Sequence, residues 1–170
     1  GEGEAAERTS FALAGLARSL PEGKWRIVPR MPNPSLSAIG LGMGGYRFDR
    51  YRSPGKGAAA IDLPEGADPA LVERTVSGVH LARDLINTPA NDMGPDDLEA
   101  AARNLARQHK ARISVIVGDD LARKNFPMIH AVGRASTVAP RLIDMRWGRS
   151  GAPKVTLVGK GVCFDTGGLD

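Results

Sequence analysis

Near the end of this 170-residue chain, a lysine and an aspartate stand in a glycine-rich run whose spacing could support chemistry. The apolar stretch 155–158 leads into a glycine-flanked Lys160, and Asp165 follows five residues later, ahead of Thr-Gly-Gly. This pattern predicts a strand whose end brings an amine and a carboxylate to one point. Glycines there permit positive φ or a close backbone approach that a Cβ would obstruct. The supporting glycines are Gly161, Gly167 and Gly168.

Taken alone, this run has simpler interpretations. A Gly-Lys-Gly turn after a strand is compatible with phosphate binding or with a solvated lysine at a strand exit. The P-loop spacing, Gly-x-x-x-x-Gly-Lys-Ser/Thr, is not present around Lys160, which excludes that nucleotide-binding motif. Asp165 by itself could be a turn or helix-cap aspartate. The motif therefore needs support from the rest of the chain.

Cysteine and histidine offer little alternative chemistry. Cys163 is the single cysteine, so no intrachain disulfide can form, and the chain is typical of a reducing compartment. Cys163 alternates with Val162 and Phe164 in an apolar run, which favours a buried small side chain over a nucleophile. The histidines form no metal-binding pair at helical spacing, and the last two are expected to be structural. They are His80, His109 and His130.

Four further segments occur in order with the motif. These are 46–51 (Tyr-Arg-Phe-Asp-Arg-Tyr), 83–93 (Arg-Asp-Leu-Ile-Asn-Thr-Pro-Ala-Asn-Asp-Met), 128–136 and 140–143, followed by Val-Gly-Lys-Gly-Val-Cys-Phe-Asp-Thr-Gly-Gly-Leu-Asp at the end. Together they resemble the leucine aminopeptidase family, also called cytosol aminopeptidases. The similarity is collinear over most of the chain, and it is weakest at 46–51. Ordered matches are far more specific than a single short motif.

The resemblance implies a metal site. In the family, two divalent ions, Mn²⁺ or Zn²⁺, lie side by side, an aspartate at the position of Asp165 bridges them, and a lysine at the position of Lys160 binds one through its amine. Lysine can be a ligand only when neutral, and a nearby dication together with burial disfavours its charged form. Two metals about 4 Å apart can polarise a scissile carbonyl and activate a bridging water.

The resemblance also implies what this chain lacks. The family's remaining metal carboxylates, its catalytic lysine and its transition-state-stabilising arginine are expected beyond Asp170, so the chain itself carries no catalytic group. The parent protein is expected to be an aminopeptidase that releases N-terminal amino acids of the leucine type from peptides. It is also expected to form a homo-hexamer. Two ligands cannot hold two divalent ions tightly, so the 170 residues alone are expected to be inactive. The alternative is a non-catalytic binding or assembly module.

Composition sets the outer limits. An apolar fraction of 42% is typical of a globular protein, and no stretch approaches the roughly 20 apolar residues of a membrane span. The start is acidic, unlike a secretory signal, so we expect a cytoplasmic protein without membrane partners. The basic, aromatic-containing segment 18–56 leaves nucleic-acid binding open as a second role, which some family members have. Aromatic residues are only 5% of the chain, however, and charge patterning alone is a weak indication.

Helical and strand patterns alternate, which predicts an α/β protein. We expect residues 1–67 to be part of a small N-terminal α/β domain, 68–88 a linking helix, and 89–170 the start of an α/β/α catalytic domain with a central mixed sheet. Proline after Asp68 and after Gly94 marks two helix starts. Helices are also expected over 6–20, over 36–51 by resemblance, and after Asp119; strands are expected at 25–28, 58–63, 113–117 (buried), 129–132, 142–147 and 155–158.

Overall fold

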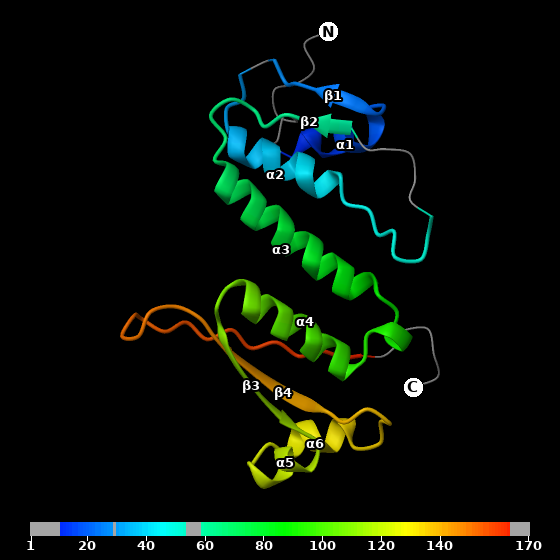
Figure 1. Cartoon of the computed structure of the whole chain (residues 1–170), viewed down its shortest axis with the longest axis vertical. Coiled ribbons are helices and arrows are strands. Elements are labelled where there is room, and N and C mark those ends of the chain that lie inside the picture. Colours follow the sequence, from blue (N-terminus) through cyan, green and yellow to red (C-terminus); the bar gives the residue numbers. More distant parts are fainter. Residues whose placement is uncertain (1–10, 29, 54–58, 164–170) are drawn as a thin grey trace. The chain divides into compact units, whose positions relative to one another are not determined.

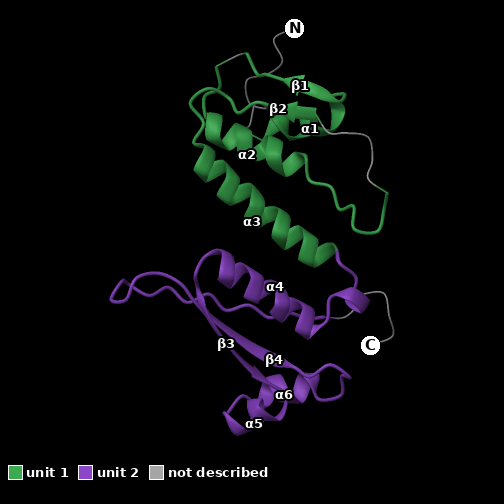
Figure 2. Ribbon diagram, viewed as in Figure 1, with its two compact units in different colours: residues 1–87 green, residues 88–170 purple. Residues whose placement is uncertain are grey.

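A computed structural model describes residues 11–28, 30–53 and 59–163 of the chain. It divides into two compact units, 1–87 and 88–170, coloured separately in Figure 2. Unit 1 contains η2 (Ala12–Gly15), α1 (Leu16–Ser19), β1 (Gly23–Trp25), α2 (Pro34–Gly44), β2 (Ala59–Ile61) and α3 (Pro69–Asn87). Unit 2 contains η3 (Ala90–Asp92), α4 (Pro95–Gln108), β3 (Arg112–Val117), α5 (Asp119–Arg123), α6 (Pro127–Gly133) and β4 (Arg141–Arg146). The predicted α/β class is confirmed.

Two helices packed side by side form the body of unit 1 (Figure 1). Each begins with a side-chain cap followed by proline, because both residues suit a helix start. The carboxylate of Asp68 accepts hydrogen bonds from the backbone N–H groups of Ala70 and Leu71 at 2.9 and 3.1 Å. The Asn33 side chain similarly accepts from the N–H of Leu36 at 3.3 Å. The helix predicted from Asp68-Pro69 is therefore confirmed.

The core of unit 1 lies between α2 and α3. Ala38 and Ile39 of α2 pack against Val72 of α3, surrounded by partly buried apolar side chains. β1 and β2 form a parallel pair with Lys24 opposite Ala60. Both strands are three residues long, shorter than the expected 58–63 and shifted from the expected 25–28.

Helix α2 ends at Gly44, which corrects the expected helix over 36–51. Beyond it, Tyr46 leaves the helical path because its ring and hydroxyl are held by residues of α3. The expected helix over 6–20 is present in its described part as a 3₁₀ turn, η2, followed by the short α1. It ends before Pro21, as predicted.

Unit 2 is built on an antiparallel pair of six-residue strands, β3 and β4, with Val115 opposite Ile143. Helix α4 packs on this pair, and α5 and α6 contact β3 and β4 respectively (Figure 1). In α4 the carboxylate of Asp97 accepts from the N–H of Gly94 at 2.9 Å and closes the predicted helix start. Every residue of strand β3 is partly buried or exposed, so the expected buried strand is wrong on burial.

Two predicted strands are absent from the described residues. The apolar run 129–132 lies in helix α6, because Pro127 occupies its first turn and a short apolar run does not by itself distinguish helix from strand. The run 155–158 has no regular secondary structure, and Val155, Leu157 and Val158 are 84%, 91% and 93% exposed. A strand needs a hydrogen-bonded neighbour, and none of the described residues pairs with this run.

Among the helices that the structure describes, none combines the length and the apolarity required to cross a membrane.

Candidate functional site

Of the two predicted metal ligands, Lys160 and Asp165, the structure describes only Lys160. Lys160 lies on an exposed segment without regular secondary structure. Asp165, Gly167 and Gly168 fall outside the described residues. That the side chains of Lys160 and Asp165 meet at one point therefore stays a prediction. Within the described ranges there is no group of three or more His, Cys, Asp or Glu side chains able to hold a metal ion.

The segment that carries Lys160 lies against the beginning of α4. A methyl group placed on Gly161 would stand 2.8 Å from Cδ2 of Leu98, closer than real Cβ contacts allow. Since Cδ2 is the end of a flexible leucine side chain that can turn aside, this distance shows that residue 161 lies close to α4 without by itself requiring a glycine.

Cys163 lies two residues further along the same segment and is partly buried, not fully buried as the sequence pattern favoured. Burial and then the nearby carboxylate of Asp97 raise the pKa of the Cys163 thiol, while Arg141 acts in the opposite direction. A thiol with a raised pKa carries less thiolate at neutral pH, and the thiolate is the nucleophile. The environment is consistent with the prediction that Cys163 is not a nucleophile.

A charged cluster beneath this segment was not predicted. Glu99 of α4 forms ion pairs with Arg141 of β4 at 2.6 Å and with Arg103 of α4 at 2.7 Å. The Glu99 and Arg141 side chains are only 14% and 13% exposed. Hydrogen bonds from Arg103 and Arg141 hold the pKa of Glu99 below its usual value. The only sequence signal was the position of Arg141 inside the family-like segment 140–143.

The segment 83–93, which resembles the opening of the family's catalytic domain, has a visible structural role at its beginning. The hydroxyl of Tyr46 donates to Asp84 at 2.8 Å and accepts from the side-chain amide of Asn87 at 3.0 Å. The guanidinium of Arg83 lies 5.3 Å from the centre of the Tyr46 ring and donates to the carbonyl of Met43 at 2.6 Å. Burial first, and then Asp84, raise the pKa of Tyr46. These α3 residues thus fix the chain that leaves α2.

The histidines are engaged in local contacts. The Nε2 of His80 lies 3.0 Å from the carbonyl oxygen of Gly42, and the Nε2 of His130 lies 3.1 Å from Asp119. The backbone N–H of His109 donates to Leu105 at the end of α4. The structural roles expected for His109 and His130 are consistent with these contacts.

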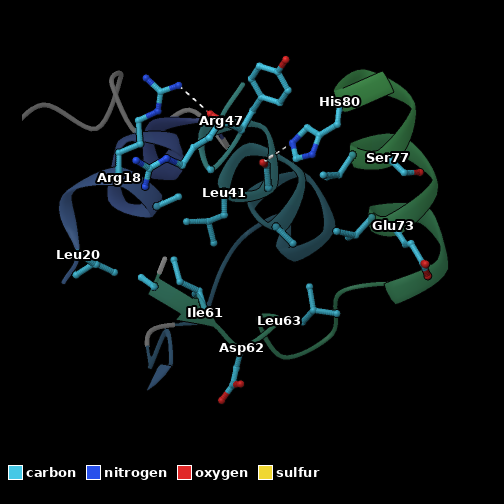
Figure 3. Close-up of a pocket in the computed structure, with 18 of the residues that line it drawn as sticks. Arg18, Leu20, Leu41, Arg47, Ile61, Asp62, Leu63, Glu73, Ser77 and His80 are labelled. Atoms are coloured by element: carbon cyan, nitrogen blue, oxygen red, sulfur yellow. Dashed lines mark hydrogen bonds between the residues drawn. The ribbon is translucent and has the colours of Figure 1, made fainter. Parts of the chain in front are cut away.

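Unit 1 also contains an open groove of about 1080 Å³ (Figure 3). Its apolar wall includes Leu41 and Ile61, and its rim includes Arg18 and Arg47 from the basic segment 18–56. Arg18 donates from Nε to the Gly44 carbonyl and from Nη2 to the Tyr46 carbonyl, each at 3.0 Å. The guanidinium of Arg18 is therefore tied to the backbone after α2, which gives this part of the basic segment a structural role.

Comparison with known proteins covers both units. The family described as cytosol aminopeptidase family, catalytic domain, matches residues 80–170, and the M17 aminopeptidase N-terminal domain matches residues 2–64. A probable cytosol aminopeptidase of Corynebacterium efficiens is 36% identical over 176 residues, covering 96% of this chain and 35% of the relative. The chain therefore spans about a third of the length of the curated relatives it matches.

Solved structures agree. The crystal structure of a cytosol aminopeptidase from Coxiella burnetii superimposes with a TM-score of 0.82 at 41% identity, covering 94% of this chain and 35% of that one. The bottromycin maturation enzyme BotP in complex with Mn gives a TM-score of 0.66 at 26% identity, covering 80% and 32%. Since the catalytic-domain match alone includes more than half of the residues, this chain belongs to the cytosol aminopeptidase family.

Proposed function

We propose that these residues serve a dinuclear metal-dependent aminopeptidase, to which they contribute Lys160 and Asp165 as part of the metal cage. The observation that carries the proposal is the ordered match of the family's N-terminal and catalytic domains, which extends through the Lys160–Asp165 motif. The donor set fits this chemistry: a carboxylate can bridge two dications, and a lysine beside them loses its proton. Lys160 is exposed, so its amine is accessible to a metal ion.

The cofactors proposed are two Mn²⁺ or Zn²⁺ ions; a manganese complex of the related BotP supports Mn²⁺. Such ions would polarise the scissile carbonyl of a peptide and activate a water. We further propose peptide substrates with leucine-type N-termini, a cytoplasmic location and a homo-hexamer, as the family resemblance implies. The 170 residues alone are proposed to be inactive because two ligands do not complete a two-metal cage.

Hydrolysis of leucine amide in added Mn²⁺ tests this proposal. Protein extended to the length of its relatives is expected to turn over, and the 170-residue chain is not. In the extended protein, Asp165→Ala and Lys160→Gln are expected to abolish activity and Mn²⁺ binding. Lys154→Gln is the matched control, because Lys154 is an exposed lysine on the same run but outside the motif.

Each result has a distinct meaning. Full activity of Asp165→Ala would refute the metal role, and robust turnover by the 170-residue chain would refute the incomplete cage. Absence of hydrolysis by the extended protein under all metal conditions would favour the non-catalytic module.

A further inference from the structure

The segment that ends in the predicted metal motif rests on a defined part of unit 2. Gly161 lies against Leu98 in the first turns of α4. Two residues later, Cys163 is within electrostatic range of Asp96, Asp97 and Arg141. Residues 161–163 therefore lie beside the beginning of α4. Any movement of α4 relative to β4 would move the surface on which this segment lies.

An ion pair connects that surface to the strand pair. Glu99 is the residue after Leu98, and its carboxylate accepts a 2.6 Å hydrogen bond from Arg141, which is 42 residues away in sequence. The same guanidinium donates from Nε and Nη2 to the carbonyl of Ala139 at 3.3 and 3.1 Å. Arg141 thus holds the first half of α4 to the backbone at the start of β4. Its own side chain is 13% exposed, so competition from water is reduced.

We propose that Arg141 and Glu99 are positioning residues for residues 160–163, which carry the proposed metal ligand Lys160. They fix the first turns of α4, and those turns seat Gly161 and Cys163, so that Lys160 is presented in one place. Neither residue is proposed to touch a metal. The metal part of this inference rests on the function proposed above, whereas the seating of 161–163 does not.

The structure supplies a matched control for the pair. Glu99 has two arginine partners, and only Arg141 joins α4 to another element, since Arg103 lies one turn along the same helix. Arg103→Gln removes an equal charge and an ion pair with the same carboxylate but leaves the link to β4 intact. Arg141→Gln and Glu99→Gln both break that link. Arg103→Gln and Arg141→Gln each remove one positive charge, so a general electrostatic effect would make these two variants alike, whereas Glu99→Gln removes a negative charge and would act in the opposite direction.

The first readout is alkylation of Cys163 by iodoacetamide, without metal, in the full-length protein, followed by peptide mass spectrometry. Arg141→Gln and Glu99→Gln are expected to raise the rate about tenfold, as for loss of a charge-assisted hydrogen bond, and Arg103→Gln to leave it unchanged. Removing the positive charge of Arg141 near the thiol would by itself slow alkylation, so an increase in Arg141→Gln reports release of the segment. Glu99 is not among the charges that act on the Cys163 thiol, so an increase in Glu99→Gln reports the same release. Far-UV circular dichroism checks that each variant is folded, and Glu99→Gln serves if Arg141→Gln is not.

The second readout is the dissociation constant for Mn²⁺ alone, measured by calorimetry. Arg141→Gln and Glu99→Gln are expected to weaken binding about 10-fold, a typical effect of residues that support metal ligands, and Arg103→Gln to have no effect. Unchanged alkylation in a folded Arg141→Gln or Glu99→Gln variant would overturn the positioning role. Equal Mn²⁺ binding by the unsubstituted protein and Asp165→Ala would instead refute the proposed metal site, and alkylation would still decide the positioning role.

Discussion

Gly44 at the end of α2 offers the sharpest test of how unit 1 is packed. A methyl group on Gly44 would overlap the carbonyl oxygen of Ala14 and stand 2.6 Å from its carbonyl carbon. The obstacle is backbone, which cannot rotate away as a side chain can. Gly78, in α3 of the same unit, is the matched control, because a methyl group there meets no atom within 4 Å. Both positions are helical, so both gain helix propensity on substitution with alanine.

The two substitutions are expected to have opposite signs. Gly78→Ala should stabilise unit 1 by about 1 kcal/mol, the difference in helix propensity. Gly44→Ala should destabilise it by about 2 kcal/mol, because overpacking costs about 1–3 kcal/mol and the propensity gain is smaller at a helix end. For a unit of this size, each kcal/mol shifts the unfolding midpoint by about 4–8 °C.

Urea and thermal unfolding followed by tryptophan fluorescence measure this difference. Trp25 lies in β1 of unit 1, whereas Trp147 in unit 2 is 77% exposed, so a Trp147→Phe background isolates the signal of unit 1. The expected gap between the two alanine variants is about 3 kcal/mol. If Gly44→Ala proved as stable as Gly78→Ala, the close contact between α2 and η2 would be refuted.

Two further predictions concern named contacts. Tyr46→Phe removes the hydroxyl that hydrogen-bonds to Asp84 and Asn87, so it should lower the thermal midpoint and speed hydrogen exchange over the last turn of α3. Tyr51→Phe, at an exposed tyrosine, is the control. Unchanged exchange in Tyr46→Phe would show that these hydrogen bonds do not hold the end of α3. Because its two arginines lower the pKa of Glu99 in the folded state, its contribution to stability is present above the unfolded pKa of about 4.3 and is lost as pH falls through the lower folded pKa. The acid limb of the stability curve should therefore flatten in Glu99→Gln, and an identical pH dependence in both proteins would show that the pair does not contribute.

Local sequence signals were reliable where the structure depends on neighbouring residues. Asp68-Pro69 and Gly94-Pro95 begin helices as predicted, because a cap and a proline act within one turn. The signals failed where the outcome depends on distant partners. The apolar run 129–132 became helix α6, and the run 155–158 pairs with no described strand, since neither fate is encoded in a run of four apolar residues.

The glycines of α2 illustrate the same limit. Their low helix propensity argues against a helix, yet α2 forms. For two of these glycines, the structure shows a close contact that leaves no room for a side chain. Gly42 lies against Val76, where a methyl group would stand 2.6 Å from Cγ2, and Gly44 lies against Ala14. Their cost in helix propensity is offset by close packing that no single-sequence scale contains.

The order of several motifs along this chain was enough to indicate its family. Residue types and spacings are readable from the sequence even where the structure does not describe the site. The resemblance also named Lys160 and Asp165 as candidate metal ligands. Only the tertiary structure joined Arg141 to Glu99 and Tyr46 to Asp84, across 42 and 38 residues. Such contacts depend on how helices pack against strands and against one another, and packing is set by all the surrounding side chains at once, not by any local pattern.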